Sequence, residues 1–271
     1  MDKKIVFLDI DGTLVEFSGN IPDSSVKAIK KAKENGHLIY ICSGRSRYQI
    51  HPQLKALGFD GYVLAAGSHV ICNNKTIFHK FIEPDAQKRL ICYLEKNNFT
   101  YDIQTDEYAV FNKRCFKKAM DRFEKMELPK EQVDILIQGA VIRENVFNCE
   151  RAEKVVYSDS TIGLHQIQKD LAGDFTITAS SLDGTSDSGE IGIAGVDKST
   201  GMEKCLKYLG IERKNCLAFG DGHNDFEMIE YAGIGVAMGN AIDELKKKAD
   251  YVTTNIHQDG IYNAFKKFGL I

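Results

Sequence analysis

Two aspartates, Asp9 and Asp11, follow directly on the short apolar segment 5–8 and precede a glycine and a threonine. The apolar segment predicts a buried strand, and ligands of open α/β sheets bind at the carboxyl ends of such strands. The two carboxylates are two residues apart, so both point the same way if the strand stays extended. Two like charges this close repel each other unless a cation or a proton lies between them. The pattern therefore predicts a site for a cation or for proton transfer.

Other interpretations of this segment are a solvated loop and a calcium loop. An acid-rich turn after a strand is often only a solvated loop, and Asp-x-Asp-Gly alone leaves that alternative open. A calcium loop of the EF-hand type needs glycine at its sixth position and glutamate at its twelfth. Counted from Asp9, those positions hold Leu14 and Asn20, so this calcium loop is rejected.

The composition is that of an ordinary soluble protein. The chain has 271 residues, of which 43% are hydrophobic and 27% charged, enough for one large domain or two ordinary ones. A net charge of −3 gives no electrostatic reason to expect a nucleic acid or an anionic membrane as partner. An anionic ligand must therefore be held by a local site or by a metal ion.

The seven cysteines are scattered, without any Cys-x-x-Cys pair. This spacing disfavours both a disulfide framework and a zinc site, and it predicts small buried side chains, as at Cys42 and Cys216. No signal peptide is expected, because only a short apolar strand follows the first four residues. No apolar run approaches the length of a membrane span. We therefore expect a cytoplasmic protein, either a monomer or a weak homo-oligomer.

Strands and helices alternate in the first and last parts of the chain. We expect strands at 5–8, 37–42, 62–65, 216–219, 234–238 and 251–254, and helices at 22–36, 45–57, 198–209, 226–232 and 242–249. The segments 70–72 and 76–78 predict a hairpin. Such alternation predicts an α/β fold with a Rossmann-like parallel-sheet core, formed by residues 1–80 and 190–271.

The middle of the chain, residues 81–189, has a different pattern. Helices are expected near 85–97, 116–126 and 161–171, with strands at 100–104, 108–111 and 175–178 between them. This segment predicts an inserted α+β cap domain whose sheet has one face toward water. The stretch 183–189, rich in Ser, Gly and Asp, is the expected hinge back to the core.

Four polar motifs lie at the ends of the expected strands or at the start of a helix. They are Asp-Ile-Asp-Gly-Thr-Leu at 9–14, Ile-Cys-Ser-Gly-Arg at 41–45, Gly-Val-Asp-Lys at 195–198 and Gly-Asp-Gly-His-Asn-Asp at 220–225. With these motifs the chain resembles the haloacid dehalogenase (HAD) superfamily of phosphohydrolases, specifically its Cof-type branch. The resemblance covers nearly the whole chain, including a large cap between the second and third motifs.

The resemblance implies a role for each motif. Asp9 is expected to be the nucleophile that forms an aspartyl-phosphate, and Asp11 the general acid and base. The hydroxyl of Ser43 and the amide of Gly44 are expected to bind phosphate oxygens. Lys198 is expected to neutralise charge on the transferred group.

The fourth motif completes the implied site. Asn224 is expected to bind phosphate together with Lys198. A Mg²⁺ ion is expected at Asp9, the backbone carbonyl of Asp11 and Asp221, while Asp225 is expected to contact a metal-bound water or to lie behind the ligands. An oxygen shell of this kind suits Mg²⁺.

The resemblance implies a Mg²⁺-dependent phosphatase acting on a small phosphorylated metabolite, such as a sugar phosphate. Two alternatives stay open: a phosphomutase similar to the phosphomannomutases, and a non-catalytic sensor of a phosphorylated ligand. The chain departs from the family pattern at Ala66, where relatives often carry asparagine. Neither the physiological substrate nor the cap residues that select it follow from the sequence.

Overall fold

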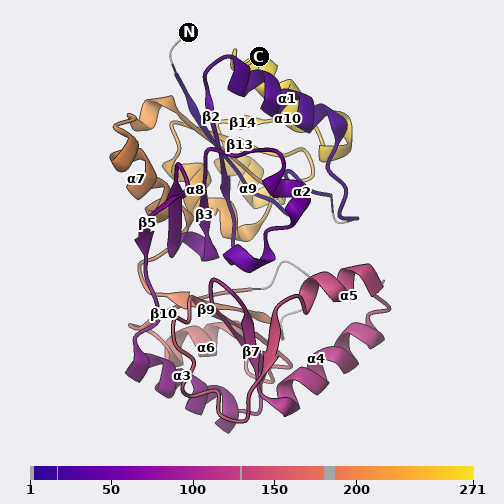
Figure 1. The fold of residues 1–271 in the computed structure, drawn as a ribbon, viewed down its shortest axis with the longest axis vertical. Helices are drawn as coiled ribbons and strands as arrows, with labels where there is room; N and C mark the ends of the chain where they lie inside the picture. Colours follow the sequence, from indigo (N-terminus) through magenta and orange to yellow (C-terminus); the bar gives the residue numbers. More distant parts are fainter. Residues whose placement is uncertain (1–2, 17, 129, 180–186) are drawn as a thin grey trace. The chain divides into compact units, whose positions relative to one another are not determined.

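The computed structural model describes residues 3–16, 18–128, 130–179 and 187–271. The chain divides into two compact units (Figure 1). Unit 1 contains residues 1–44, 51–79 and 197–271, and unit 2 contains residues 45–50 and 80–196. Of the expected hinge, residues 183–186 lie outside the described part of the chain.

Unit 1 is built on a sheet of eight strands in the order β14-β13-β12-β1-β2-β3-β4-β5. Pairing is parallel from β14 to β3, and β4 and β5 add an antiparallel hairpin at one edge. These findings confirm the predicted α/β fold and the predicted hairpin. The strands are β1 (Ile5–Leu8), β2 (Leu38–Cys42), β3 (Gly61–Leu64), β4 (His69–Cys72), β5 (Lys75–His79), β12 (Cys216–Gly220), β13 (Ile234–Ala237) and β14 (Tyr251–Val252).

Helices cover both faces of this sheet, with α1 and α10 on one face and α7 and α8 on the other (Figure 1). Strand β1 is fully buried at all four positions, as expected of a central parallel strand. The helices are α1 (Asp23–Glu34), α2 (Pro52–Lys55), α7 (Lys198–Leu209), α8 (Phe226–Tyr231), α9 (Asp243–Lys248) and α10 (Gly260–Lys267). Short 3₁₀ turns are η2 (Ala65–Gly67), η3 (Arg213–Asn215), η4 (His223–Asp225) and η5 (Ile256–Gln258).

The helix predicted at 45–57 is not continuous. It consists of the 3₁₀ turn η1 (Arg47–Gln49) and the short helix α2, separated by two residues. His51 has φ −61° and ψ 145°, an extended conformation. The ring of Pro52 explains the break, since a proline disfavours helical geometry at the residue before it.

Unit 2 contains a six-stranded sheet in the order β10-β11-β9-β6-β7-β8. All pairs are antiparallel except β7 with β8. The strands are β6 (Thr100–Gln104), β7 (Ala109–Phe111), β8 (Ala140–Ile142), β9 (Lys154–Ser158), β10 (Phe175–Ala179) and β11 (Gly189–Ile193). The helices are α3 (Pro84–Lys96), α4 (Lys113–Lys125), α5 (Lys130–Leu136) and α6 (Leu164–Asp170). Because β11 pairs within this sheet, the structure places the return to unit 1 after residue 196 rather than at residue 190.

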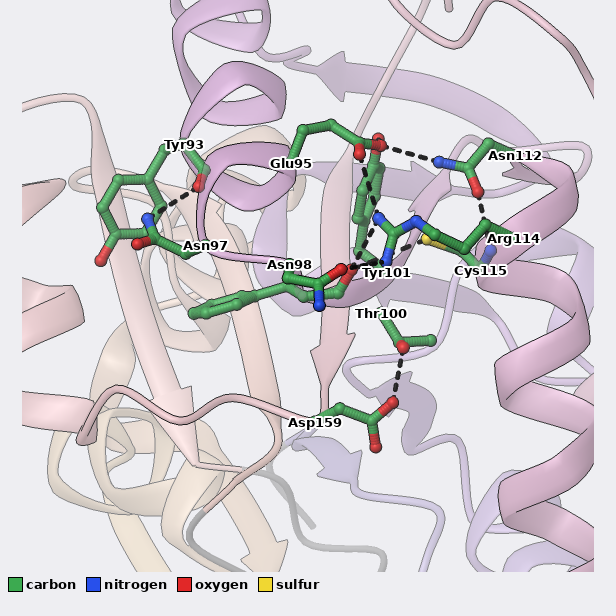
Figure 2. A network of polar contacts seen from close by, with 11 residues as sticks. Tyr93, Glu95, Asn97, Asn98, Thr100, Tyr101, Asn112, Arg114, Cys115 and Asp159 are labelled. Carbon is green, nitrogen blue, oxygen red and sulfur yellow. Dashed lines mark hydrogen bonds and ion pairs between the residues drawn. The ribbon is translucent and has the colours of Figure 1, made fainter.

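One face of the unit 2 sheet packs on its helices, with Tyr101, Ile103 and Ile191 buried in a common apolar cluster. A network of polar contacts connects helices α3 and α4 to this sheet (Figure 2). Glu95, near the end of α3, accepts hydrogen bonds from the Tyr101 hydroxyl at 2.7 Å and the Asn112 amide at 2.8 Å, and it pairs with Arg114 at 3.0 Å. Asn112 also caps α4. The network thus links α3 to strand β6 and to the start of α4.

No helix in the described ranges is both long enough and apolar enough to cross a membrane.

Candidate active site

The centre of the site is a buried lysine between two carboxylates. Asp9 directly follows β1, where its amide continues the sheet by donating to the carbonyl of Phe219 at 3.0 Å. The Nζ of Lys198 lies 2.7 Å from Asp9 Oδ1 and 2.5 Å from Asp225 Oδ1. Lys198 is 1% exposed, Asp9 5% and Asp225 0%. Residues 189 positions apart in the chain therefore form one charged cluster away from solvent.

Lys198 is positioned by the start of helix α7. The preceding residue, Asp197, caps the helix by accepting from the amide of Thr200 at 2.8 Å. The Thr200 hydroxyl in turn accepts from the Asp197 amide at 3.0 Å. This reciprocal arrangement fixes the first turn of the helix. The Lys198 ammonium is therefore held at the end of the sheet.

Burial alone lowers the pKa of Lys198, but the carboxylates of Asp225 and Asp9 outweigh this effect and raise it above its usual value. The side chain is consequently charged at neutral pH. A buried cation held by two anions is suited to neutralise a third anionic group that enters the site.

Asp225 uses both of its carboxylate oxygens for contacts inside the protein. While Oδ1 faces Lys198, Oδ2 accepts hydrogen bonds from the backbone amides of Asp221 at 2.8 Å and Gly222 at 2.9 Å. The 3₁₀ turn η4 brings the side chain back onto the end of β12 in this way. Asp225 thus holds both the lysine and the Asp221 backbone in place.

Asp221 lies beside the turn that follows Asp9. The hydroxyl of Thr13 donates to Asp221 Oδ1 at 2.9 Å. Gly12 has φ +80°, and a Cβ at this position would lie 2.2 Å from Asp221 Oδ2. Only glycine therefore allows both the turn and the approach of the carboxylate.

Asn240, which lies outside the four motifs, supports the same turn. Its amide nitrogen donates to the Gly12 carbonyl at 2.7 Å, and its oxygen accepts from the amide of Ile256 at 3.0 Å. Asn240 comes directly after Gly239, three positions beyond the end of strand β13. A polar residue at the end of an apolar strand was the signal in the sequence that could have found it.

The electrostatics of the cluster favour binding of a cation. Burial, reinforced by the neighbouring carboxylates and opposed by Lys198, raises the pKa of Asp9 well above its usual value. Burial and the charge of Asp225 raise the pKa of Asp221 to about 7. Carboxylate oxygens of Asp9, Asp221 and Asp225 lie within 4.8 Å of one another. One lysine does not balance this negative charge, and an all-oxygen set suits a hard divalent cation.

The remaining predicted residues lie at the same edge of the sheet. Asp11 is half-buried in the turn after Asp9, and its negative charge contributes to the raised pKa of Asp9. Ser43 is buried directly after β2, where its amide donates to the Val63 carbonyl at 2.9 Å. Gly44 follows it and is buried as well, and Asn224 lies half-buried in η4 next to Asp225. The roles of these residues in binding phosphate stay predictions.

The segment that departs from the family pattern has an unusual backbone. Ala65 and Ala66 have φ values of 47° and 52°, in the left-handed region. The amide of Ala66 donates to the carbonyl of Ser43 at 3.1 Å, which links this turn to the Ser43 backbone. Asparagine tolerates the left-handed region better than alanine does. The structure therefore gives a backbone reason for asparagine at this position in relatives.

Comparison with known proteins agrees with this geometry. The model of a family described as haloacid dehalogenase-like hydrolase matches residues 6–265. The 5-amino-6-(5-phospho-D-ribitylamino)uracil phosphatase YwtE of Bacillus subtilis is 30% identical to the chain, with 95% of each covered. A crystal structure from Geobacillus kaustophilus HTA426 superposes with a TM-score of 0.85 at 25% identity, covering 100% of both chains.

A further solved structure, the HAD subclass IIB sugar phosphatase BT4131, has a TM-score of 0.79 at 27% identity and covers 99% of this chain and 100% of its own. The family match spans almost the entire sequence, and YwtE and BT4131 are both named as phosphatases. The chain belongs to the haloacid dehalogenase-like hydrolases and is a phosphatase of that family.

Proposed function

We propose that the protein is a Mg²⁺-dependent phosphatase that hydrolyses small phosphomonoesters through an aspartyl-phosphate on Asp9. The observation that carries this proposal is the buried ammonium of Lys198 between Asp9 and Asp225, with Asp221 alongside. Strongly perturbed acids gathered at strand ends are typical of catalytic sites.

In the first step, an oxygen of Asp9 attacks phosphorus while the bond from phosphorus to the leaving alcohol breaks. Asp11 gives its proton to the departing oxygen. In the second step, water attacks the aspartyl-phosphate, Asp11 takes a proton from it, and inorganic phosphate leaves with Asp9 regenerated. Lys198, Ser43, the Gly44 amide and Asn224 bind the phosphate oxygens in both steps.

Asp9, Asp221 and the backbone carbonyl of Asp11 would hold the metal ion. Asp225 has both oxygens engaged, so it would act by orienting Lys198 and the Asp221 backbone. The ion would reduce the repulsion between an anionic carboxylate and an anionic phosphate. Burial, reinforced by the neighbouring carboxylates, raises the pKa values of Asp9 and Asp221, and a cation beside them would favour their ionised forms.

The substrate class that we propose is the phosphorylated sugar or polyol. YwtE is named for a substrate with a phosphorylated ribityl chain, and BT4131 is described as a sugar phosphatase. Both names point to a phosphate carried on a hydroxyl-bearing carbon chain. Residues 81–189, as the predicted cap, would select among such substrates.

Phosphate release from p-nitrophenyl phosphate and from a panel of sugar and polyol phosphates tests the proposal. We expect turnover with Mg²⁺, loss of turnover after chelation with EDTA, and recovery when Mg²⁺ is restored. Asp9→Asn should abolish release, since an amide is a far poorer nucleophile. Lys248→Met, a change at an exposed ion pair with Glu230, is the control variant and should retain activity.

The same assay separates the alternatives. A phosphomutase would move phosphate between positions of one sugar without releasing it, and a sensor would bind phosphorylated compounds without turnover. Full activity in EDTA, or Asp9→Asn with more than a few per cent of the wild-type rate, would overturn the proposal.

A further inference from the structure

Two buried cysteines of unit 1 lie in contact although they are 133 positions apart in the sequence. Cys72 ends strand β4 and Cys205 lies in helix α7, and their Sγ atoms are 3.3 Å apart. Both side chains are 0% exposed, and both thiols are free. Sulfur atoms joined in a disulfide lie about 2.05 Å apart, so these two would have to approach each other by only about 1.2 Å.

The sheet places a tyrosine beside this pair. In the register Tyr40 on β2 and Cys72 on β4 both lie opposite Gly61 on β3, so the three residues share one face. A Cβ at Gly61 would lie 2.2 Å from Tyr40 Cε1, so the tyrosine ring lies over the glycine that separates it from Cys72. The Tyr40 hydroxyl is buried and makes no hydrogen bond within the described ranges. A phenol in this position can donate to a thiolate at Cys72.

The surroundings make the two thiols unequal. Contact with Cys205 lowers the pKa of the Cys72 thiol although burial opposes this effect, and the Tyr40 hydroxyl acts in the same direction as Cys205. Contact with Cys72, together with burial, raises the pKa of Cys205. Because the thiolate is the reactive form of cysteine, Cys72 is the member of the pair that reacts first.

Cys72 lies next to the turn of the edge hairpin. It directly precedes Asn73 and Asn74, which have φ values of 49° and 62°, and its partner in the register is the exposed Lys75 on the edge strand β5. Such edge segments open locally at a smaller free energy than the core does. Opening of this hairpin would expose Cys72 to a small oxidant.

Helix α7 connects the pair with the active site inside unit 1. Cys205 and Lys198 are buried on the same face of the helix, seven residues or about two turns apart. Between them the helix packs tightly, since a Cβ at Gly201 would lie 2.5 Å from Val63 Cγ1 and 3.0 Å from the Cα of Gly67. Close-packed interiors transmit strain. A pull on Cys205 toward β4 would therefore tilt α7 about this contact and move the first turn, which carries Lys198.

We infer that Cys72 and Cys205 are a peroxide-sensitive thiol pair whose disulfide restrains α7 and slows turnover by displacing Lys198. The effect on turnover rests on the role of Lys198 in the proposed function, whereas formation of the disulfide does not.

A peroxide is the oxidant in this reaction. The Cys72 thiolate attacks one oxygen of hydrogen peroxide, the O–O bond breaks, and the departing hydroxide takes up a proton to become water, which leaves a sulfenic acid on Cys72. The Cys205 sulfur then attacks the Cys72 sulfur, the S–O bond breaks, and a second water leaves with the proton of Cys205. The two sulfur atoms together lose the two electrons that the peroxide gains. A dithiol such as dithiothreitol reverses the reaction by thiol–disulfide exchange.

Treatment of the full chain with hydrogen peroxide tests the inference, in a Cys92→Ser background because Cys92 is exposed. We expect the thiols that react with N-ethylmaleimide in urea to fall by two, and peptide mass spectrometry without reduction to find Cys72 joined to Cys205. Turnover should fall about 2- to 30-fold, the range of a modest coupling between distant sites, and recover with dithiothreitol. Tm of the oxidised protein should rise, because the crosslink restricts the unfolded chain.

Two further variants in the same background separate the pair from the other cysteines. Cys205→Ala should form no disulfide, and peroxide should leave its turnover unchanged. Cys216→Ala is the matched control, because Cys216 is also buried in unit 1 but its Sγ contacts the Leu217 carbonyl instead of a second thiol. It should lose two thiols and respond to peroxide as the background protein does.

Retention of the Cys72 and Cys205 thiols under conditions that oxidise Cys92 in the wild type would overturn the inference, as would a sulfinic acid at Cys72 without a crosslink. A crosslinked protein with unchanged turnover would overturn it too. A loss of turnover together with a lower Tm would indicate damage to the fold and would also count against it. Absence of turnover in the untreated enzyme would instead overturn the proposed function, while the thiol count would still test the crosslink.

Discussion

Replacing Lys198 by methionine removes an ammonium group that lies 2.7 Å from Asp9 Oδ1 and 2.5 Å from Asp225 Oδ1, while it keeps most of the side chain's length. The carboxylates left behind are almost inaccessible to water. Removing one partner of a buried ion pair costs about 3–5 kcal/mol. In a chain of this size 1 kcal/mol corresponds to about 2–4 °C, so Tm should fall by about 6–20 °C.

Asp225→Asn should be destabilising by a similar amount. Asparagine keeps an oxygen for the backbone amides of Asp221 and Gly222, but it loses the negative charge that faces Lys198. If the two residues stabilise each other, the double variant should lose about 1–3 kcal/mol less than the sum of the single variants. Urea and thermal unfolding in EDTA, followed by circular dichroism, measure these differences without a contribution from bound metal.

The exposed ion pair of Lys248 with Glu230, at 2.7 Å, is the matched control. Its side chains are 58% and 50% exposed, and Lys248→Met should change the unfolding free energy by less than about 1 kcal/mol. A loss for Lys198→Met as small as this, or single losses that add within about 0.5 kcal/mol, would refute the argument. The lysine would then not be held by Asp225 in the folded protein.

Asp11→Asn should slow phosphate release about 10²–10⁴-fold from an ester with a poor leaving group, such as glycerol phosphate, and less from p-nitrophenyl phosphate; equal losses would contradict its role as proton donor. Ala66→Gly should raise the unfolding free energy by about 1 kcal/mol, because φ of 52° strains alanine, and an unchanged Tm would argue against strain. Burial raises the pKa of Asp102 to about 7, so the folded protein keeps a proton that the unfolded chain releases. The protonated carboxyl therefore stabilises the fold near pH 4, and this stabilisation is lost as pH rises through 7. The unfolding free energy of Asp102→Asn minus that of wild type, measured in urea, should grow by about 2–4 kcal/mol between those pH values. A difference that stays constant with pH would refute this prediction.

The sequence placed the main acidic residues correctly at strand ends because that placement depends on local pattern. Asp9 follows β1 and Asp221 follows β12, as the apolar segments before them predicted. Carboxyl ends of parallel strands share one edge, so the proximity of these residues could be expected. The same pattern could place Asn240 near this edge, but it could not show that its amide donates to the Gly12 carbonyl, since that contact depends on the conformation of two loops.

In unit 2 the prediction succeeded for long amphipathic helices such as α3 and failed for short irregular strands. Strand β11 contains Gly189 and Gly192, and glycine weakens a strand pattern. Strand β9 begins with Lys154, whose burial depends on partners from other strands. Because both strands went unpredicted, the ion pair of Lys154 with Glu190 that joins them could not be recognised from the sequence.

The active site is electrostatically unfavourable for the fold that contains it. Burial raises the pKa values of Asp9 and Asp221, so each ionised carboxylate opposes folding. Apolar residues of similar volume would be at least as stabilising as the buried pair of Lys198 and Asp225. Yet Thr13, two backbone amides and the capped start of α7 hold these charges together. These contacts hold the buried charges in an arrangement that does not favour folding by itself. We explain the arrangement by the binding of a cation and a phosphate at this site.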